Sequence, residues 1–213
     1  MADSTIHEAI THLACTHLLI EPFVVTTHRE LPESHCVYCL LMPHFQGTIL
    51  INYGAWKLLT APGQGVNSLL PPTIAQSRTV AVQGLRQLGF NDQMFLKHLE
   101  DRGVMDKEAL PLYPYRDDGL AVWHALHDWV EAYLKAHYSD DMEQANKAVK
   151  DDEALQNWAR EIIHLDGGRL EQFGDEGDGK ISTLSYLADA LTMVIFTGSA
   201  QHAAVNFPPE GRL

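Results

Sequence analysis

Apolar residues recur at helical spacing along most of the chain, and no convincing strand pattern is visible. The clearest example follows Gly119, where Val122, Leu126, Val130 and Leu134 repeat near the helical period. The pattern therefore predicts an all-α fold without strands. The segments expected to be helical are residues 4–20, 35–42, 44–60, 73–88, 91–102, 119–138, a stretch from 140 that breaks near 150–152, 153–165 and 181–207.

Proline, glycine and acidic clusters mark the expected breaks between these helices. Glu21-Pro22 is expected to end the first helix, which makes residues 22–34 a connection. Residues 166–180 are rich in glycine and acids and are expected to form an exposed loop. Their acids lack the alternate spacing of an EF-hand, so a calcium site is not predicted. Because no internal repeat or domain boundary is visible, residues 1–213 are interpreted as a single domain.

The last helical stretch, residues 192–207, is apolar almost all round, which predicts a buried helix. His202 and Asn206 interrupt it at a spacing of four, so they lie one turn apart on the same face. An imidazole and an amide oxygen that leave a buried helix together could share a metal ion. The alternative is that His202 is an ordinary core histidine held by hydrogen bonds.

Near the N-terminus, three imidazoles follow one another at intervals of five, as His7, His12 and His17. Five α-helical steps turn neighbouring side chains about 140° apart, so a regular helix would not bring them together. A π-helical turn, with i→i+5 hydrogen bonds, would bring His7 and His12 onto one face. With His202 and Asn206, this pair would offer three nitrogens and one oxygen, a set that suits a divalent transition metal better than calcium or magnesium.

Composition narrows the range of partners. The chain has 213 residues, 46% of them hydrophobic, and a formal net charge of -13, which argues against nucleic acid or an anionic membrane surface as partner. The three cysteines, Cys15, Cys36 and Cys39, are interpreted as reduced thiols. No signal peptide or apolar run of membrane-spanning length is visible. A cytoplasmic protein without a transmembrane segment is therefore expected.

Four stretches of the chain, in order, resemble the catalytic domain of the lipoxygenases. They are HEAITHLACTH (7–17), EPFVVTTHRELPESH (21–35), LPLYPYRDDGLAVW (110–123) and TMVIFTGSAQHAAVNF (192–207). The resemblance implies buried central helices surrounded by further helices, and a non-haem iron, less often manganese. It assigns His7, His12, His202 and Asn206 as the metal ligands and places His17 just outside the ligand set.

The same resemblance implies a fatty-acid dioxygenase. A metal-bound hydroxide would remove a hydrogen from a cis,cis-1,4-pentadiene unit of a polyunsaturated fatty acid, and O2 would add to give a hydroperoxide. Leu50 is matched with a position that controls the face and carbon that oxygen attacks, and ordinary helix packing is the alternative for it. A zinc hydrolase is a weaker interpretation, because the second histidine after His7-Glu8 comes one residue too late for H-E-x-x-H.

The position of these ligands in the chain predicts a central piece of the domain, with both ends truncated. The first ligand lies close to Met1, and only a short Pro- and Gly-containing segment separates Asn206 from Leu213, whose carboxylate is not assigned the family's terminal-ligand role. The alternative function is therefore a non-catalytic helical fragment that folds or binds metal without turnover. Uncovered apolar faces would favour self-association.

Overall fold

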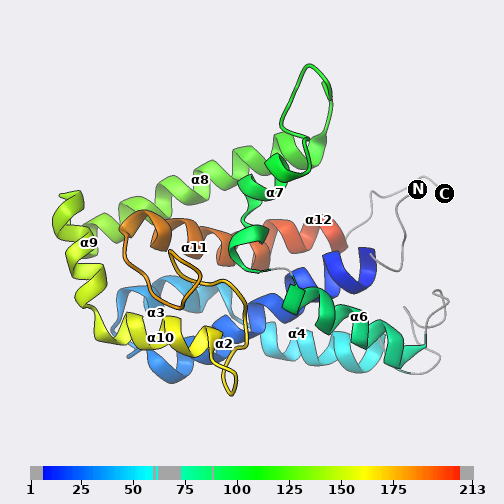
Figure 1. The fold of residues 1–213 in the computed structure, drawn as a ribbon, viewed down its shortest axis with the longest axis horizontal. Helices are drawn as coiled ribbons and strands as arrows, with labels where there is room; N and C mark the ends of the chain where they lie inside the picture. Colours follow the sequence, from blue (N-terminus) through cyan, green and yellow to red (C-terminus); the bar gives the residue numbers. More distant parts are fainter. Residues whose placement is uncertain (1–6, 60, 62–72, 88, 207–213) are drawn as a thin grey trace.

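The computed structural model describes residues 7–59, 61, 73–87 and 89–206, and within these ranges it contains helices and turns but no strand. The predicted all-α fold is confirmed (Figure 1). The helices are η1 (His7–Leu18), α2 (Leu19–Glu30), α3 (Cys36–Leu41), η2 (Met42–His44), α4 (Thr48–Gly54), η3 (Ala55–Leu59), α6 (Ile74–Gln87), η4 (Asn91–Gln93), α7 (Phe95–Asp101), α8 (Pro114–His137), α9 (Met142–Asp151), α10 (Glu153–Ile163), α11 (Leu184–Phe196), η5 (Thr197–Gln201) and α12 (His202–Asn206).

The first helix does not end at Pro22, and this prediction is wrong. The π-helix η1 continues directly into α2, which carries Pro22 inside it and ends at Glu30. A proline inside a helix costs about 3 kcal/mol, but burial of a large apolar side chain contributes about 1.5–3 kcal/mol. Phe23 and Val24 are buried beside Pro22, and Leu19 and Ile20 are buried just before it. Packing therefore outweighs the local penalty.

Other boundaries differ in smaller ways. The helix expected over residues 44–60 begins at Thr48, because Gly47 adopts a left-handed φ of 80° and turns the chain before α4. It then widens into the π-helix η3. The helix expected from Gly119 begins earlier, at Pro114, where proline suits the first helical turn. The break near residues 150–152 is confirmed, since Asp152 caps the start of α10.

Buried apolar residues from α2, near the start of the chain, and from α11, near its end, belong to one core. At its centre, the ring of Phe23 in α2 packs against Phe90, Trp158 and Phe173. The indole N–H of Trp158 donates to the Thr27 hydroxyl, which joins α10 to α2. Most side chains of α11 are buried, as predicted from its composition, and α11 packs along α8 (Figure 1).

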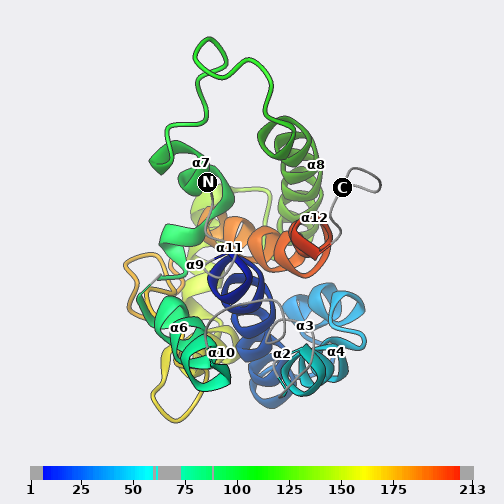
Figure 2. The same ribbon diagram turned by 90° about the vertical axis from the view of Figure 1, so that its right-hand side faces the viewer.

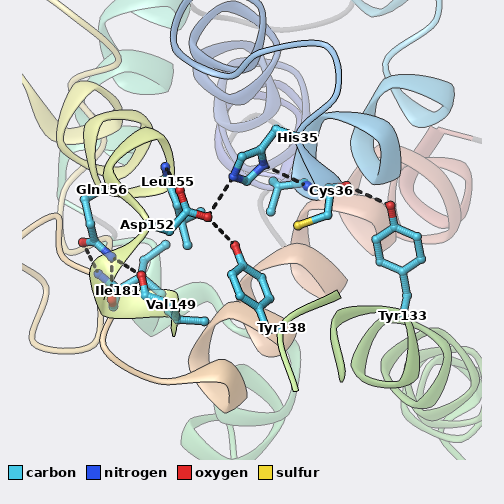
Figure 3. A network of polar contacts seen from close by, with 10 residues as sticks. His35, Cys36, Tyr133, Tyr138, Val149, Asp152, Leu155, Gln156 and Ile181 are labelled. Atoms are coloured by element: carbon cyan, nitrogen blue, oxygen red, sulfur yellow. Dashed lines mark hydrogen bonds and ion pairs between the residues drawn. The ribbon is translucent and has the colours of Figure 1, made fainter. Parts of the chain in front are cut away.

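A polar network joins the start of α3, the end of α8 and the start of α10 (Figure 3). Asp152 accepts hydrogen bonds from the His35 imidazole at 3.0 Å and the Tyr138 hydroxyl at 2.8 Å, and its second oxygen caps α10 through the Leu155 N–H. Burial alone would raise the pKa of Asp152, but these hydrogen bonds lower it to about 2. The carboxylate is therefore a structural anchor at neutral pH.

One window of the described helices, Ile10–Glu30, is long and apolar enough to cross a membrane, with a mean hydropathy of 1.2. This window is not expected from the sequence, because Pro22 was predicted to end the helix. Of this window, 56% is buried inside the protein. A buried core helix has the same length and composition as a membrane span, and the packing of η1 and α2 against α6 and α10 identifies this one as a core helix.

Candidate metal centre

The two histidine-bearing segments lie side by side, as predicted. The π-helix η1 contacts both η5 and α12, so the beginning and the end of the described chain lie next to each other (Figures 1 and 2). On its other side η1 packs along α6, where Gly84 permits a close approach. A Cβ added there would lie only 3.1 Å from the Ile10 side chain. The histidines of η1 are thus held on a helix packed from two sides.

Three imidazoles converge at this junction. The Nε2 atom of His17 lies 3.3 Å from Nε2 of His12 and 3.2 Å from Nε2 of His202. One ligand atom from each of the three residues can be chosen so that all lie within 4.8 Å of one another. His12 and His17 are buried, and His202 is partly buried. The junction therefore brings three nitrogen donors together, shielded on the η1 side from solvent.

Helix geometry explains why His12 and His17 meet. They are five residues apart on η1, and π-helical i→i+5 bonding brings such residues onto one face. The predicted π-helical turn is confirmed. Another π-helix, η5, ends immediately before His202 and was not predicted. Because a π-turn changes the rotation of the helix that follows it, η5 helps to set the direction in which His202 leaves α12.

The three nitrogens fit a transition-metal ion. An ion about 2.1 Å from each imidazole nitrogen would separate adjacent nitrogens by roughly 3.0 Å at octahedral angles and roughly 3.4 Å at tetrahedral angles. The separations of 3.2 and 3.3 Å fall between these values. Imidazole must be neutral to bind a metal. Burial lowers the pKa of His17, and burial together with the neighbouring imidazoles lowers the pKa of His202 to about 4.

A thiolate is not part of this donor set. Cys15 lies on η1 between His12 and His17, and burial raises the pKa of its thiol to about 12. Cys15 is also not among the residues whose ligand atoms lie within 4.8 Å of one another, which are His12, His17 and His202. Nitrogen donors without thiolate suit iron, manganese or zinc, so the donor set by itself does not choose among these metals.

His17 also binds a buried side chain from α4. Its Nδ1 lies 2.8 Å from Asn52 Oδ1, and Asn52 Nδ2 donates to the His17 carbonyl at 2.8 Å and to Glu21 Oε2 at 3.2 Å. Asn52 is only 7% exposed. Asn52 could not be identified from the sequence, because nothing in the sequence indicates that α4 crosses the junction of η1 and α2.

The structure places the His17 imidazole inside this cluster. The resemblance placed it outside the ligand set, but its imidazole is the one that faces both His12 and His202. The run of histidines at intervals of five contained this signal, since His12 and His17 have the same spacing as His7 and His12. The side chains of His7 and Asn206 lie outside the described residues, so their assignment stays a prediction. The backbone of α12 does place Asn206 one turn after His202.

Leu50, the candidate stereocontrol residue, lies on α4 with 75% of its surface exposed. Ordinary packing inside the described part of the chain therefore does not account for it. Three further large apolar side chains are exposed beside it, Ile49, Ile51 and Tyr53. They form an apolar surface on α4, and the role of Leu50 in oxygen attack stays a prediction.

Comparison with known proteins is consistent with this geometry. The family model described as Lipoxygenase matches residues 1–209. A linoleate 9/13-lipoxygenase of Pseudomonas aeruginosa is 40% identical, and the alignment covers 98% of this chain and 29% of that protein. The human polyunsaturated fatty acid lipoxygenase ALOX15B is 37% identical, with 96% of this chain and 29% of that protein covered.

Solved structures of lipoxygenases have a fold similar to that of this chain. The crystal structure of coral 8R-lipoxygenase superposes with a TM-score of 0.82 at 32% identity, covering 95% of this chain and 30% of that one. A fungal lipoxygenase from Fusarium graminearum gives a TM-score of 0.78 at 28% identity, covering 95% of this chain and 30% of that one. The chain thus spans about three-tenths of the length of these four proteins. A match over nearly every residue, joined to this cluster of three imidazoles, shows that the chain belongs to the lipoxygenase family.

Proposed function

We propose that the chain holds a non-haem iron or manganese ion at the cluster of His12, His17 and His202, and that this centre serves the dioxygenation of a polyunsaturated fatty acid. The observation that carries the proposal is the convergence of three imidazole nitrogens in a chain of the lipoxygenase family. In this proposal His17 takes the role that the resemblance gave to His7. Asn206 remains the proposed fourth donor, because α12 places it one turn beyond His202.

Each residue of the cluster would supply one nitrogen ligand. His12 and His17 provide two nitrogens from one rigid π-helix, and His202 provides the third from α12. All three imidazoles are uncharged donors, so they would hold the ion without cancelling its charge. A bound iron or manganese would supply the one-electron oxidation that starts attack on a pentadiene. The buried surroundings of His12 and His17 keep water away from that side of the cluster.

The proposed substrate and product follow from the relatives. The bacterial relative is named for linoleate, and the human relative for polyunsaturated fatty acids. We therefore propose that a fatty acid with a cis,cis-1,4-pentadiene unit and O2 are the substrates, and that a lipid hydroperoxide is the product. A cytoplasmic location is proposed as well, supported by the free thiols of Cys15, Cys36 and Cys39.

The test loads the purified chain with Fe²⁺, supplies linoleate, and follows conjugated-diene absorbance together with oxygen uptake. We expect weak turnover that depends on iron and is lost in His202→Ala. Weak turnover is expected because the chain spans only 29% of the bacterial relative and 29% of the human relative. If His202→Ala turned over as fast as the wild-type chain, the proposed centre would be wrong.

A second candidate function is a helical unit that binds metal without turnover, and the same short coverage favours it. The apolar surface of Ile49, Leu50, Ile51 and Tyr53 would then be free to drive self-association. Stoichiometric iron binding with no hydroperoxide would support this second function. Light scattering of the same sample would report the self-association.

A further inference from the structure

We propose that Asn52 and Glu21 form a positioning pair that locks His17 in the tautomer needed for metal binding. The inference rests on the proposed metal centre, but it concerns residues that do not touch the ion. Asn52 would act through His17, and Glu21 would act through Asn52. The chain of contacts runs from a carboxylate on α2, through an amide on α4, to an imidazole on η1.

The orientation of the Asn52 amide follows from its partners. Its Nδ2 lies 2.8 Å from the His17 carbonyl oxygen and 3.2 Å from Glu21 Oε2, and both of these atoms accept hydrogen bonds. The NH2 group has two hydrogens, one for each acceptor. The flipped amide would place Oδ1 against two other acceptors and would lose both hydrogen bonds. The oxygen, not the nitrogen, therefore faces His17.

The tautomer of His17 follows from that orientation. Because Asn52 Oδ1 can only accept, His17 Nδ1, which lies 2.8 Å away, must donate its hydrogen. In a neutral imidazole the other nitrogen then carries the lone pair. That nitrogen is Nε2, the atom that faces His12 and His202. The amide thus aims the lone pair of His17 at the centre of the cluster.

The fold makes this arrangement rigid. His17 and Asn52 are 5% and 7% exposed, so water does not compete easily for their hydrogen bonds. Glu21 lies in the first turn of α2, one helical turn after His17. The helix α4, which carries Asn52, packs against α2, which carries Glu21 (Figures 1 and 2). Partners of this kind are needed to orient metal-binding histidines, and their loss typically weakens metal binding about 10- to 100-fold.

The first test reads the tautomer directly and needs no metal. Long-range ¹H–¹⁵N NMR correlations of the apo protein distinguish an Nδ1–H from an Nε2–H imidazole, and His17→Gln identifies the His17 signals. We expect the Nδ1–H form in the wild-type chain and in Asn52→Asp, whose carboxylate can still accept. In Asn52→Leu we expect the Nε2–H form to appear. A wild-type His17 in the Nε2–H form would overturn the proposal whether or not the protein binds metal.

The second test measures the dissociation constant for Co²⁺, whose ligand-field absorbance reports binding at the imidazoles. We expect Asn52→Leu to raise this constant about 10- to 100-fold. Asn52→Asp should stay close to wild type, although its carboxylate repels Glu21 and lowers the stability of the apo protein. Adding Glu21→Gln to Asn52→Asp gives the new carboxylate one donor, although the His17 carbonyl still faces it, so part of the apo stability should recover while Co²⁺ binding stays strong.

A purely structural role for Asn52 predicts a different pattern, in which Co²⁺ affinity follows apo stability across the variants. That pattern, or an unchanged dissociation constant in Asn52→Leu, would overturn the positioning role. If Asn52→Leu does not fold, Asn52→Asp alone decides, because loss of Co²⁺ binding in this variant would contradict the tautomer argument. Absence of saturable Co²⁺ binding by the wild-type chain would instead refute the proposed metal centre itself.

Discussion

Replacing His17 by alanine should abolish tight metal binding, whereas replacing His7 should not. The Nε2 atom of His17 lies within 3.3 Å of both other imidazole nitrogens, so its loss removes the donor shared by the two contacts. Protein zinc sites bind with about 10–16 kcal/mol. Divided among about four donors, this is roughly 2.5–4 kcal/mol for each ligand. Loss of one ligand should therefore raise the dissociation constant about 100- to 1,000-fold.

The assay compares His7→Ala, His12→Ala, His17→Ala and the wild-type chain. Each protein is loaded with Fe²⁺ without oxygen and desalted, its metal content is measured, and its dissociation constant is then determined by calorimetry. His17→Ala also leaves the buried Asn52 Oδ1 without its donor, which should cost about 1–3 kcal/mol of apo stability. Urea unfolding of each apo protein therefore accompanies the assay.

The outcome separates two ligand assignments. If His7→Ala loses iron and His17→Ala retains it, the ligand set implied by the resemblance is right and the cluster of His12, His17 and His202 is not the metal site. If only His12→Ala and His17→Ala lose iron while their apo forms stay folded, the geometry of the junction is the correct guide.

Three further predictions concern stability and product. Asp152→Asn should lower the free energy of unfolding by about 2 kcal/mol at pH 7, the value of a pKa depressed from 3.8 to about 2. Because a depressed acid stabilises the fold above its unfolded pKa, the difference between variant and wild type should shrink as pH falls from about 4 toward 2, and a difference that is independent of pH would contradict this origin. Trp158→Ala should cost about 3–5 kcal/mol in urea unfolding, because a fully buried indole and its hydrogen bond to Thr27 are lost together, and a cost below that of an exposed site would show that the aromatic core is misplaced. Leu50→Ala should change stability by no more than about 0.5 kcal/mol, since Leu50 is 75% exposed. A stereocontrol role for Leu50 predicts a changed hydroperoxide chirality in that variant, and an unchanged product would exclude the role.

Helical periodicity was sufficient to predict the class of fold and most of the helices. The buried nature of α11 followed from its composition, because a helix without a polar face has to be covered on all sides. The π-helical turn near the N-terminus also followed from the sequence, since imidazoles five residues apart cannot share a face of an α-helix. The end of the first helix did not follow from the sequence. The tendency of proline to end a helix is a local effect, whereas the burial of Phe23 that outweighs it depends on tertiary packing.

The choice among the three N-terminal histidines depended on the tertiary structure. Intervals of five make the pair His7 and His12 equivalent to the pair His12 and His17 within the helix itself. Only the position at which α12 crosses η1 brings His202 to His17, and these residues are far apart in sequence. The role of Asn52 could not be predicted from the sequence either, because its hydrogen bond to His17 joins two helices that no local sequence pattern relates. Sequence periodicity determines which residues share a face of a helix, whereas packing between helices decides which of those faces meet.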